Sequence, residues 1–405
     1  MRDRELQKAI IRRRRVAALV AAVAVGVVVG LVLVASRGGG GAPRVVPAVD
    51  APALVTSLPL RSAGDGLPGT PAPLDPHDVY AADRPGQLSP AVRFDRPLVY
   101  VPNSESATVS EIDPASRTVV ATLPVGRLPQ HVVPSWDLRT LWVANDAGNS
   151  LTALNPRTGR PGRTVPVTDP YNLYFTPNGR FAIVVSEALS RLDFRDPQSM
   201  ALRHTLALPC SGADHLDFTA SGRYALLSCE FSGELLVIDV LRQRVAYQIG
   251  LPAGSMPQDV KLSPDGATFF VADQTQGGLF EFYAKGFRRR GFLATGAGAH
   301  GLYVDRASRA LFVSNRRAGT VSVVSFQQRR VVRTFQIPGG SPDMGGLSAD
   351  GRELWLSGRY NAEVYDIDVR TGRLLARIPV GQGPHGLCVF PQPGRYSLGH
   401  TGILR

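Results

Sequence analysis

From residue 97 onward the sequence repeats itself every 41 to 44 residues, and this period constrains the fold more than any other feature. Each unit contains four short apolar stretches separated by turns that are rich in Gly, Asp and Asn. In the last full unit we expect strands that begin at Met344 and continue over 353–357, 363–368 and 374–380. Four strands per unit of about 42 residues are typical of a β-propeller blade.

The number of units predicts how the ring closes. Equivalent positions near the start of the first strand are 41, 43, 44, 41, 44 and 41 residues apart, namely His131, Asn172, His215, Asp259, His300, Met344 and His385. The unit at 98–125 lacks a first strand, and the strand at 385–390 lacks a unit. If they share a sheet, the chain forms an all-β, seven-bladed propeller without free edges.

Short motifs within the units resemble the YVTN repeat family of bacterial surface and periplasmic seven-bladed propellers. They read LVYVPN at 98–103, LWVAN at 141–145, LFVSN at 311–315 and GTVSVV at 319–324. The resemblance covers roughly residues 97–395. It implies the propeller fold, but it says little about activity because members of such families serve many functions.

The segment before the repeats predicts a membrane anchor. Residues 16–35 form an uncharged apolar run that spans roughly 30 Å as a helix, the thickness of a hydrocarbon core. Residues 1–15 carry seven basic and two acidic side chains, so the positive-inside rule places this end in the cytoplasm. We therefore expect a single-pass transmembrane helix in the plasma membrane and an extracytoplasmic propeller, with a cleaved signal peptide as the alternative. Residues 36–96 predict a disordered Pro/Gly-rich tether, and residues 396–405 a C-terminal tail.

The formal net charge of +12 would ordinarily suggest an anionic partner such as nucleic acid. Much of it lies in the first fifteen residues, where it serves topology instead. The remaining basic cluster has no interleaved aromatic residues and is expected outside the cytoplasm, so no nucleic-acid partner is predicted. This basic patch either faces anionic lipid or cell-wall polymer or is merely solvated, and it comprises Lys285, Arg288, Arg289, Arg290, Arg329 and Arg330.

Four of the seven equivalent starts are histidines. Starts of first strands and ends of second strands lie on one face of a propeller, so these side chains should surround the mouth of the central channel. Imidazoles suit zinc, copper or haem iron, although a repeated His can instead bond to backbone between blades. The predicted ligand-binding set is His131, Asn145, His215, Asp259, Asp273, His300, Asn315 and His385.

The favoured function is a binding or scaffold module for an extracytoplasmic protein or a small molecule. A lactonase-type hydrolase and a metal-handling or haem-handling propeller are the alternatives. The sequence has no nucleophile elbow, Walker loop or dinucleotide fingerprint, and most acidic residues fall in turns. We therefore predict no dedicated cofactor, with a metal or haem at the histidines left open.

The three cysteines divide into a pair and a single residue. Cys210 and Cys229 are expected on the same face of one blade, where an oxidising compartment would permit a disulfide. Cys388 falls in an apolar strand and is expected to be a buried thiol.

Overall fold

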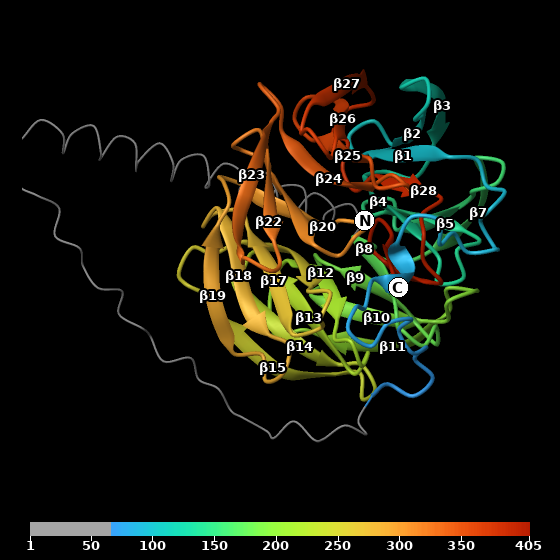
Figure 1. The fold of residues 1–405 in the computed structure, drawn as a ribbon. Coiled ribbons are helices and arrows are strands. Elements are labelled where there is room, and N and C mark those ends of the chain that lie inside the picture. The colour runs from blue at the N-terminus through green and yellow to red at the C-terminus, as the bar shows by residue number, and fades with distance from the viewer. Residues whose placement is uncertain (1–65) are drawn as a thin grey trace, which may run out of the picture. The chain divides into compact units, whose positions relative to one another are not determined.

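The computed structural model describes residues 66–405, and it confirms the seven-bladed all-β propeller (Figure 1). The expected anchor at 16–35 and the first part of the expected tether lie outside the described residues. Within residues 66–405, no helix is both long and apolar enough to cross a membrane. The only helix in this range is the short 3-10 helix η1 (Ala81–Asp83).

Each blade is an antiparallel sheet of four strands that follow one another from the inside of the ring outward. Blades 1 to 3 are β28 (Cys388–Phe390), β1 (Leu98–Asn103), β2 (Thr108–Asp113), β3 (Thr118–Pro124); β4 (Pro129–Pro134), β5 (Leu141–Asn145), β6 (Ser150–Asn155), β7 (Arg160–Pro166); and β8 (Asn172–Phe175), β9 (Ala182–Ser186), β10 (Arg191–Arg195), β11 (Leu202–Ala207). Blades 4 and 5 are β12 (Ala213–Phe218), β13 (Tyr224–Cys229), β14 (Glu234–Asp239), β15 (Arg244–Gly250); and β16 (Pro257–Leu262), β17 (Thr268–Asp273), β18 (Gly278–Tyr283), β19 (Arg289–Ala294). Blades 6 and 7 are β20 (Ala299–Val304), β21 (Ala310–Asn315), β22 (Thr320–Ser325), β23 (Arg330–Gln336); and β24 (Pro342–Leu347), β25 (Glu353–Gly358), β26 (Glu363–Asp368), β27 (Leu374–Pro379).

The ring closes as the repeat count predicts. Strand β28 lies beside β1, with Tyr100 opposite Cys388 and Leu98 opposite Phe390 (Figure 1). The first blade therefore combines strands from both ends of the propeller. This arrangement leaves no inner strand without a partner.

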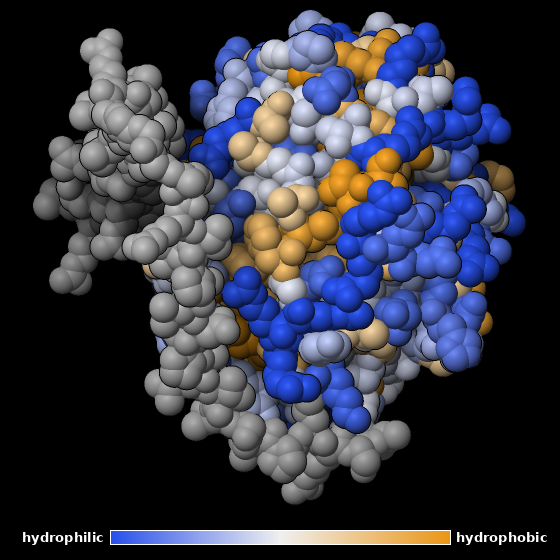
Figure 2. Space-filling model, turned by 60° about the vertical axis from the view of Figure 1, so that its left-hand side comes forward, coloured by the Kyte–Doolittle hydropathy of each residue, from blue (hydrophilic) through white to orange (hydrophobic). Residues whose placement is uncertain are grey.

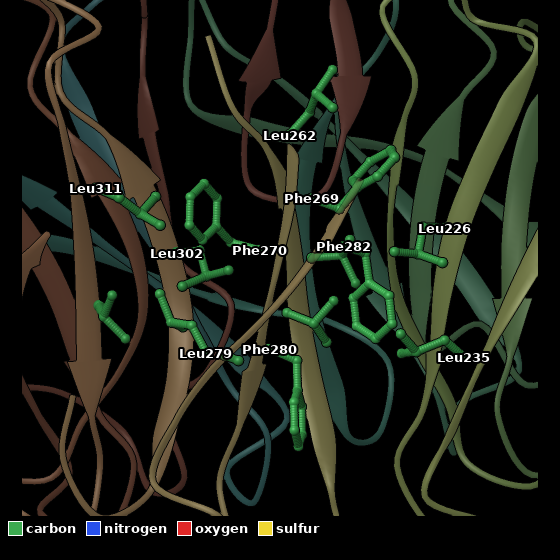
Figure 3. Close-up of a cluster of buried hydrophobic side chains, with 14 of the residues drawn as sticks. Leu226, Leu235, Leu262, Phe269, Phe270, Leu279, Phe280, Phe282, Leu302 and Leu311 are labelled. Carbon is green, nitrogen blue, oxygen red and sulfur yellow. The ribbon is translucent and has the colours of Figure 1, made fainter. Parts of the chain in front are cut away.

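The core lies between the blades. The largest cluster packs both faces of blade 5 against its neighbours, and Figure 3 shows its side chains. Consecutive side chains of a strand point to opposite faces, so Phe269 lies toward Leu226 of blade 4 whereas Phe270 lies toward Leu302 of blade 6. The apolar stretches of the repeat are thus buried on both faces, which is why they read as continuous hydrophobic runs.

The outermost strands carry the solvent-facing surface. Strands β7 and β11 are almost entirely exposed, in contrast to the buried inner strands. The side of the molecule that carries β19 and β23 comes forward in Figure 2, where hydrophilic residues surround smaller groups of hydrophobic ones.

Two expectations about the ends of the propeller are corrected. The sequence predicts a disordered tether up to residue 96, but within residues 66–96 Leu67 and Val79 donate backbone hydrogen bonds to Ser221 and Pro264, and Val92 is fully buried. The predicted tail at 396–405 instead forms β29 (Ser397–Gly399) and β30 (Ile403–Leu404), which extend the sheet of blade 3 past β8. Both segments carry buried apolar side chains that pack on the propeller, and this packing overrides their loop-like composition.

Candidate functional site

The four predicted histidines come together in the channel. His131, His215 and His300 lie in the innermost strands β4, β12 and β20, and His385 lies just before β28. They are between 0% and 3% exposed, so they line the interior of the channel and not an open mouth. The prediction placed them around an open channel mouth, whereas the observed side chains are buried.

A fifth histidine, which the sequence analysis did not identify, joins them from the C-terminal segment. The ring of His400 lies 4.4 Å from that of His215 and 5.4 Å from that of His131, between centroids. Its backbone N–H donates to the carbonyl of Leu173 at 3.0 Å. The preceding Gly399 has a φ of +104°, and a Cβ there would lie 2.4 Å from the same carbonyl, so glycine permits this approach. These five residues are called the histidine cluster below.

Three members of the histidine cluster are spaced as metal ligands are. One ring nitrogen from each of His131, His215 and His400 lies within 4.8 Å of the others, and all three residues are buried. Neither ring nitrogen of His131 has a hydrogen-bond partner, although buried polar atoms are normally paired. We call these three residues the histidine triad. Unpaired imidazole nitrogens that face one another in a buried site are typical of ligands for a transition metal.

Carboxylates and an amide surround the histidine triad. Asp214 Oδ1 lies 3.2 Å from His215 Nε2, and Asp259 Oδ1 lies 3.4 Å from His400 Nε2. The Nδ2 of Asn172 lies 3.0 Å from His215 Nδ1 and 3.1 Å from His400 Nδ1. Because one amide contacts both rings, its orientation sets which nitrogen of each histidine carries the proton.

Burial disfavours the charged form of four of these imidazoles. Desolvation lowers the pKa of His131 and His215 well below the usual 6.5, and the neighbouring histidines add to this effect. Burial has the same effect on the pKa of His300, where Arg316 adds to it, and on that of His385, where Arg359 does. A neutral imidazole has a free lone pair, which is the form that binds metal.

The other two histidines belong to a separate polar network that the sequence analysis missed. Asp343 Oδ2 lies 2.7 Å from His385 Nδ1, and its Oδ1 lies 3.2 Å from His300 Nδ1. Arg316 also contacts this carboxylate, with its Nε 2.9 Å from Oδ1, and it contacts the ring of His300. These two histidines are thus already partnered by charged groups, whereas His131 is not.

Three of the predicted ligands have structural roles instead. The Nδ2 of Asn145 donates to the hydroxyls of Ser150 and Thr152 at 3.2 and 2.9 Å, and Asn315 makes the equivalent pair of bonds in blade 6. Asp273 accepts hydrogen bonds from the N–H groups of the turn that follows it. Asp259, in contrast, does border the histidine triad, so five of the eight predicted residues come together in the channel.

The cysteine pair and the basic patch lie away from this site. Cys210 and Cys229 form a disulfide with a Cα–Cα distance of 6.2 Å, and Cys388 is a buried free thiol. In the basic patch, Arg329 pairs with Glu281, and Arg290 donates to the Thr268 hydroxyl at 2.7 Å. The rest of the patch has exposed side chains, namely Lys285, Arg288, Arg289 and Arg330.

Comparison with known proteins gives a family and a fold. The sequence model of a family described as a YNCE-like beta-propeller matches residues 82–395. No curated protein matches the chain. Similar solved structures include a protein of unknown function from Desulfotomaculum acetoxidans, with 14% identity over 72% of this chain and 98% of that one and a TM-score of 0.62.

Two further structures have similar folds. A protein from Bacteroides uniformis, provisionally described as a 6-phosphogluconolactonase, shares 17% identity over 72% of this chain and 99% of that one, with a TM-score of 0.58. The dihydro-haem d1 dehydrogenase NirN shares 16% identity over 82% of each chain, with a TM-score of 0.56. At these identities the likeness concerns the fold alone.

Proposed function

Because the chain belongs to the YNCE-like β-propeller family, whose fold serves many roles, we propose its function from its channel: it is a binding module that holds a transition-metal ion at the histidine triad. The observation that carries the proposal is that three buried imidazoles lie within 4.8 Å of one another, one of them with both ring nitrogens unpaired. An all-imidazole donor set suits Zn²⁺ or Cu²⁺ better than Mg²⁺ or Ca²⁺, which prefer oxygen ligands.

The surroundings of the histidine triad support this proposal. Metal-ligating histidines usually have their second ring nitrogen oriented by a carboxylate or an amide. Asn172 contacts the Nδ1 atoms of His215 and His400, whereas Asp214 and Asp259 lie beside their Nε2 atoms, on the side of the metal. A metal held at Nε2 requires Asn172 to present its oxygen to the two Nδ1–H groups. The amide must then rotate and give up the hydrogen bond that its Oδ1 accepts from the Leu173 N–H at 2.8 Å.

The alternative functions fit the channel less well. A porphyrin has no room between imidazoles whose centroids lie 4.4 to 5.5 Å apart, which disfavours haem held by the histidine triad. A lactone could reach these histidines only after other residues moved, because the triad is at most 2% exposed. The similarity of the fold to a provisional lactonase and to a haem d1 dehydrogenase does not offset these observations.

The proposal is tested by metal binding to the full chain. After chelation and dialysis, the protein is titrated with Zn²⁺ and Cu²⁺, and bound metal is measured by calorimetry and elemental analysis. We expect one ion per chain and loss of binding in His131→Ala. His204→Ala is the matched control, because His204 is exposed in β11. Equal binding by His131→Ala and the wild type would refute the assignment.

We further propose that this module is anchored in the plasma membrane and acts outside the cytoplasm. The apolar run at 16–35 and its basic flank support this topology, and the disulfide is compatible with an oxidising compartment. Protease added to intact cells should then digest the propeller and spare a cytoplasmic N-terminal epitope. Digestion of both, or of neither, under conditions that cleave a known surface protein argues against the topology.

The basic patch is proposed to face anionic lipid. Its residues lie in two neighbouring blades, and most of them are exposed. Replacing Arg288, Arg289 and Arg330 by Gln should reduce co-sedimentation of the protein with phosphatidylglycerol vesicles at low salt. Unchanged co-sedimentation would show that the patch is merely solvated.

A further inference from the structure

A small, partly open cavity borders the histidine triad at His400. Its volume is about 50 Å³, and His400 forms part of its wall. The remaining wall comes from the C-terminal segment, from the inner strands of blades 5, 6 and 7, with Lys261, Tyr303 and Gly346 among their residues, and from the ion-paired Asp83 and Arg306 together with Tyr80. A cavity that holds one water molecule has a volume of roughly 10–15 Å³ when it is counted in the same way, so this cavity has room for only a few non-hydrogen atoms.

Lys261 is the feature of this cavity that the metal site does not explain. The residue is 6% exposed and lies in the inner strand β16. Among residues 66–405, no ion pair or hydrogen bond joins its ammonium group to another side chain. A buried ammonium without a direct partner is costly, so it is normally paired with an anion.

The charged groups near Lys261 are engaged elsewhere. Asp83 forms an ion pair with Arg306 at 2.9 Å, and Asp217 forms one with Arg405 at 3.0 Å. Asp259 lies 3.4 Å from the His400 ring. Lys261 acts on the carboxyl groups of Asp83 and Asp259 at longer range. Burial raises the pKa of Asp83 to about 6 and the charge of Lys261 offsets only part of this rise, whereas for Asp259 burial is outweighed and Lys261 is the largest influence that lowers the pKa. Its three N–H donors are therefore available to something inside the cavity.

We propose that this cavity binds a small inorganic anion, which Lys261 holds on one side and the metal ion of the histidine triad holds on the other. The inference rests on the proposed metal function, because three protein ligands leave a coordination position for an external one. The volume favours anions of a few atoms, the size of azide or cyanate. Lys261 is thus a positioning residue for the anion and not a metal ligand.

The test uses azide as the probe and the full chain loaded with Cu²⁺. Azide that binds copper produces a charge-transfer absorption band, so its affinity is read without any assay of activity. We expect a saturable band in the wild type. In Lys261→Met, copper affinity should be unchanged while azide affinity falls at least about tenfold, the loss typical of one charge-assisted hydrogen bond.

Two further variants show whether a loss of azide binding comes from the lost charge of Lys261, from the size of the cavity or from a folding defect. Lys285→Met removes an exposed lysine and should leave azide binding unchanged. Gly346→Ala narrows the cavity without changing charge, since its Cβ would lie 3.3 Å from Gln392 Nε2 and 3.7 Å from Val389 Cγ2, and it should also weaken azide. If Lys261→Met does not fold, Gly346→Ala decides the question.

The outcomes distinguish the two proposals. If the protein binds copper but shows no azide band, or binds azide equally well in Lys261→Met and Gly346→Ala, the anion site is refuted and the metal site stands. If copper does not bind to the histidine triad, both proposals fail.

Discussion

Replacing Gly386 by alanine tests whether the position of His131 matters to the site. A Cβ added to Gly386 would lie 2.0 Å from His131 Nδ1, 2.7 Å from Cγ and 2.8 Å from Cε1. Real Cβ atoms essentially never approach other heavy atoms more closely than 3.0 Å. Gly386 is therefore the residue that makes room for this imidazole, and alanine must displace it.

The displacement falls on the imidazole because the backbone is held. The Gly386 N–H donates to the Gln130 carbonyl at 2.9 Å, and its own carbonyl accepts from Val132 N–H at 3.0 Å. The φ of Gly386 is not positive, so alanine adds no backbone strain. The ring must therefore move by about 1 Å or more to restore an ordinary contact distance.

The magnitudes follow from this displacement. Overpacking of this kind typically costs about 1–3 kcal/mol of stability. For the roughly 340 residues of 66–405 the unfolding entropy is about 0.7 kcal/mol/K, so the melting temperature should fall by about 1.5–4 °C. A metal ligand moved by this distance should weaken Zn²⁺ binding about tenfold or more, as the loss of an orienting group does.

Calorimetric titration with Zn²⁺ and thermal unfolding of the full chain measure both effects. Gly250→Ala is the matched control, because a Cβ on Gly250 has no neighbour within 4 Å and its φ is not positive. If Gly386→Ala binds Zn²⁺ as tightly as the wild type, His131 is not a ligand and the reasoning is wrong.

Other residues give predictions about stability. Replacing Cys210 and Cys229 together by Ala should lower the unfolding free energy by up to about 3 kcal/mol, measured by urea denaturation, and unchanged stability would contradict a role for the disulfide. Arg405→Met leaves the carboxylate of Asp217 buried without its ion pair and should lower the unfolding free energy by about 3–5 kcal/mol; a variant as stable as the wild type in urea denaturation would argue against this. Burial raises the pKa of Asp366 from 3.8 to about 6, so ionising this group costs stability as pH rises from about 4 to about 6. Asp366→Asn should remove this part of the pH dependence of the unfolding free energy, measured by urea denaturation between about pH 4 and about pH 6. If the unfolding free energies of the wild type and the variant change equally with pH, the prediction is wrong.

The sequence predicted those parts of the structure that the repeat encodes. Equivalent positions of a propeller occupy equivalent places, so the spacing of His131 and His215 was enough to place both in the innermost strands on one face. The pairing of β28 with β1 followed from a missing strand at one end and an extra one at the other.

The sequence could not predict contacts that only the finished ring creates. His400 lies outside the repeat, and its place depends on Tyr396 stacking on Trp136 and on Gly399 passing close to Leu173. Asp343 is adjacent to an equivalent position, and nothing in the local pattern distinguishes it from a turn acid. Asn145, in contrast, was predicted as a ligand but has a structural role. From the sequence alone, an amide that bonds to two hydroxyls within its blade cannot be told from one that binds a ligand.

The origin of the three ligands has a consequence for folding. His131 comes from blade 2 and His215 from blade 4, whereas His400 follows β28, the strand that closes the ring, by ten residues. The histidine triad is therefore complete only when the ring is closed and the C-terminal segment is inside the channel. A metal ion bound there stabilises the closed state alone, by about 2.7 kcal/mol when free metal is a hundredfold above its dissociation constant. Buried apolar side chains also hold β28 and the C-terminal segment, so the ring closes without the metal. The metal would add stability where the two ends of the propeller meet.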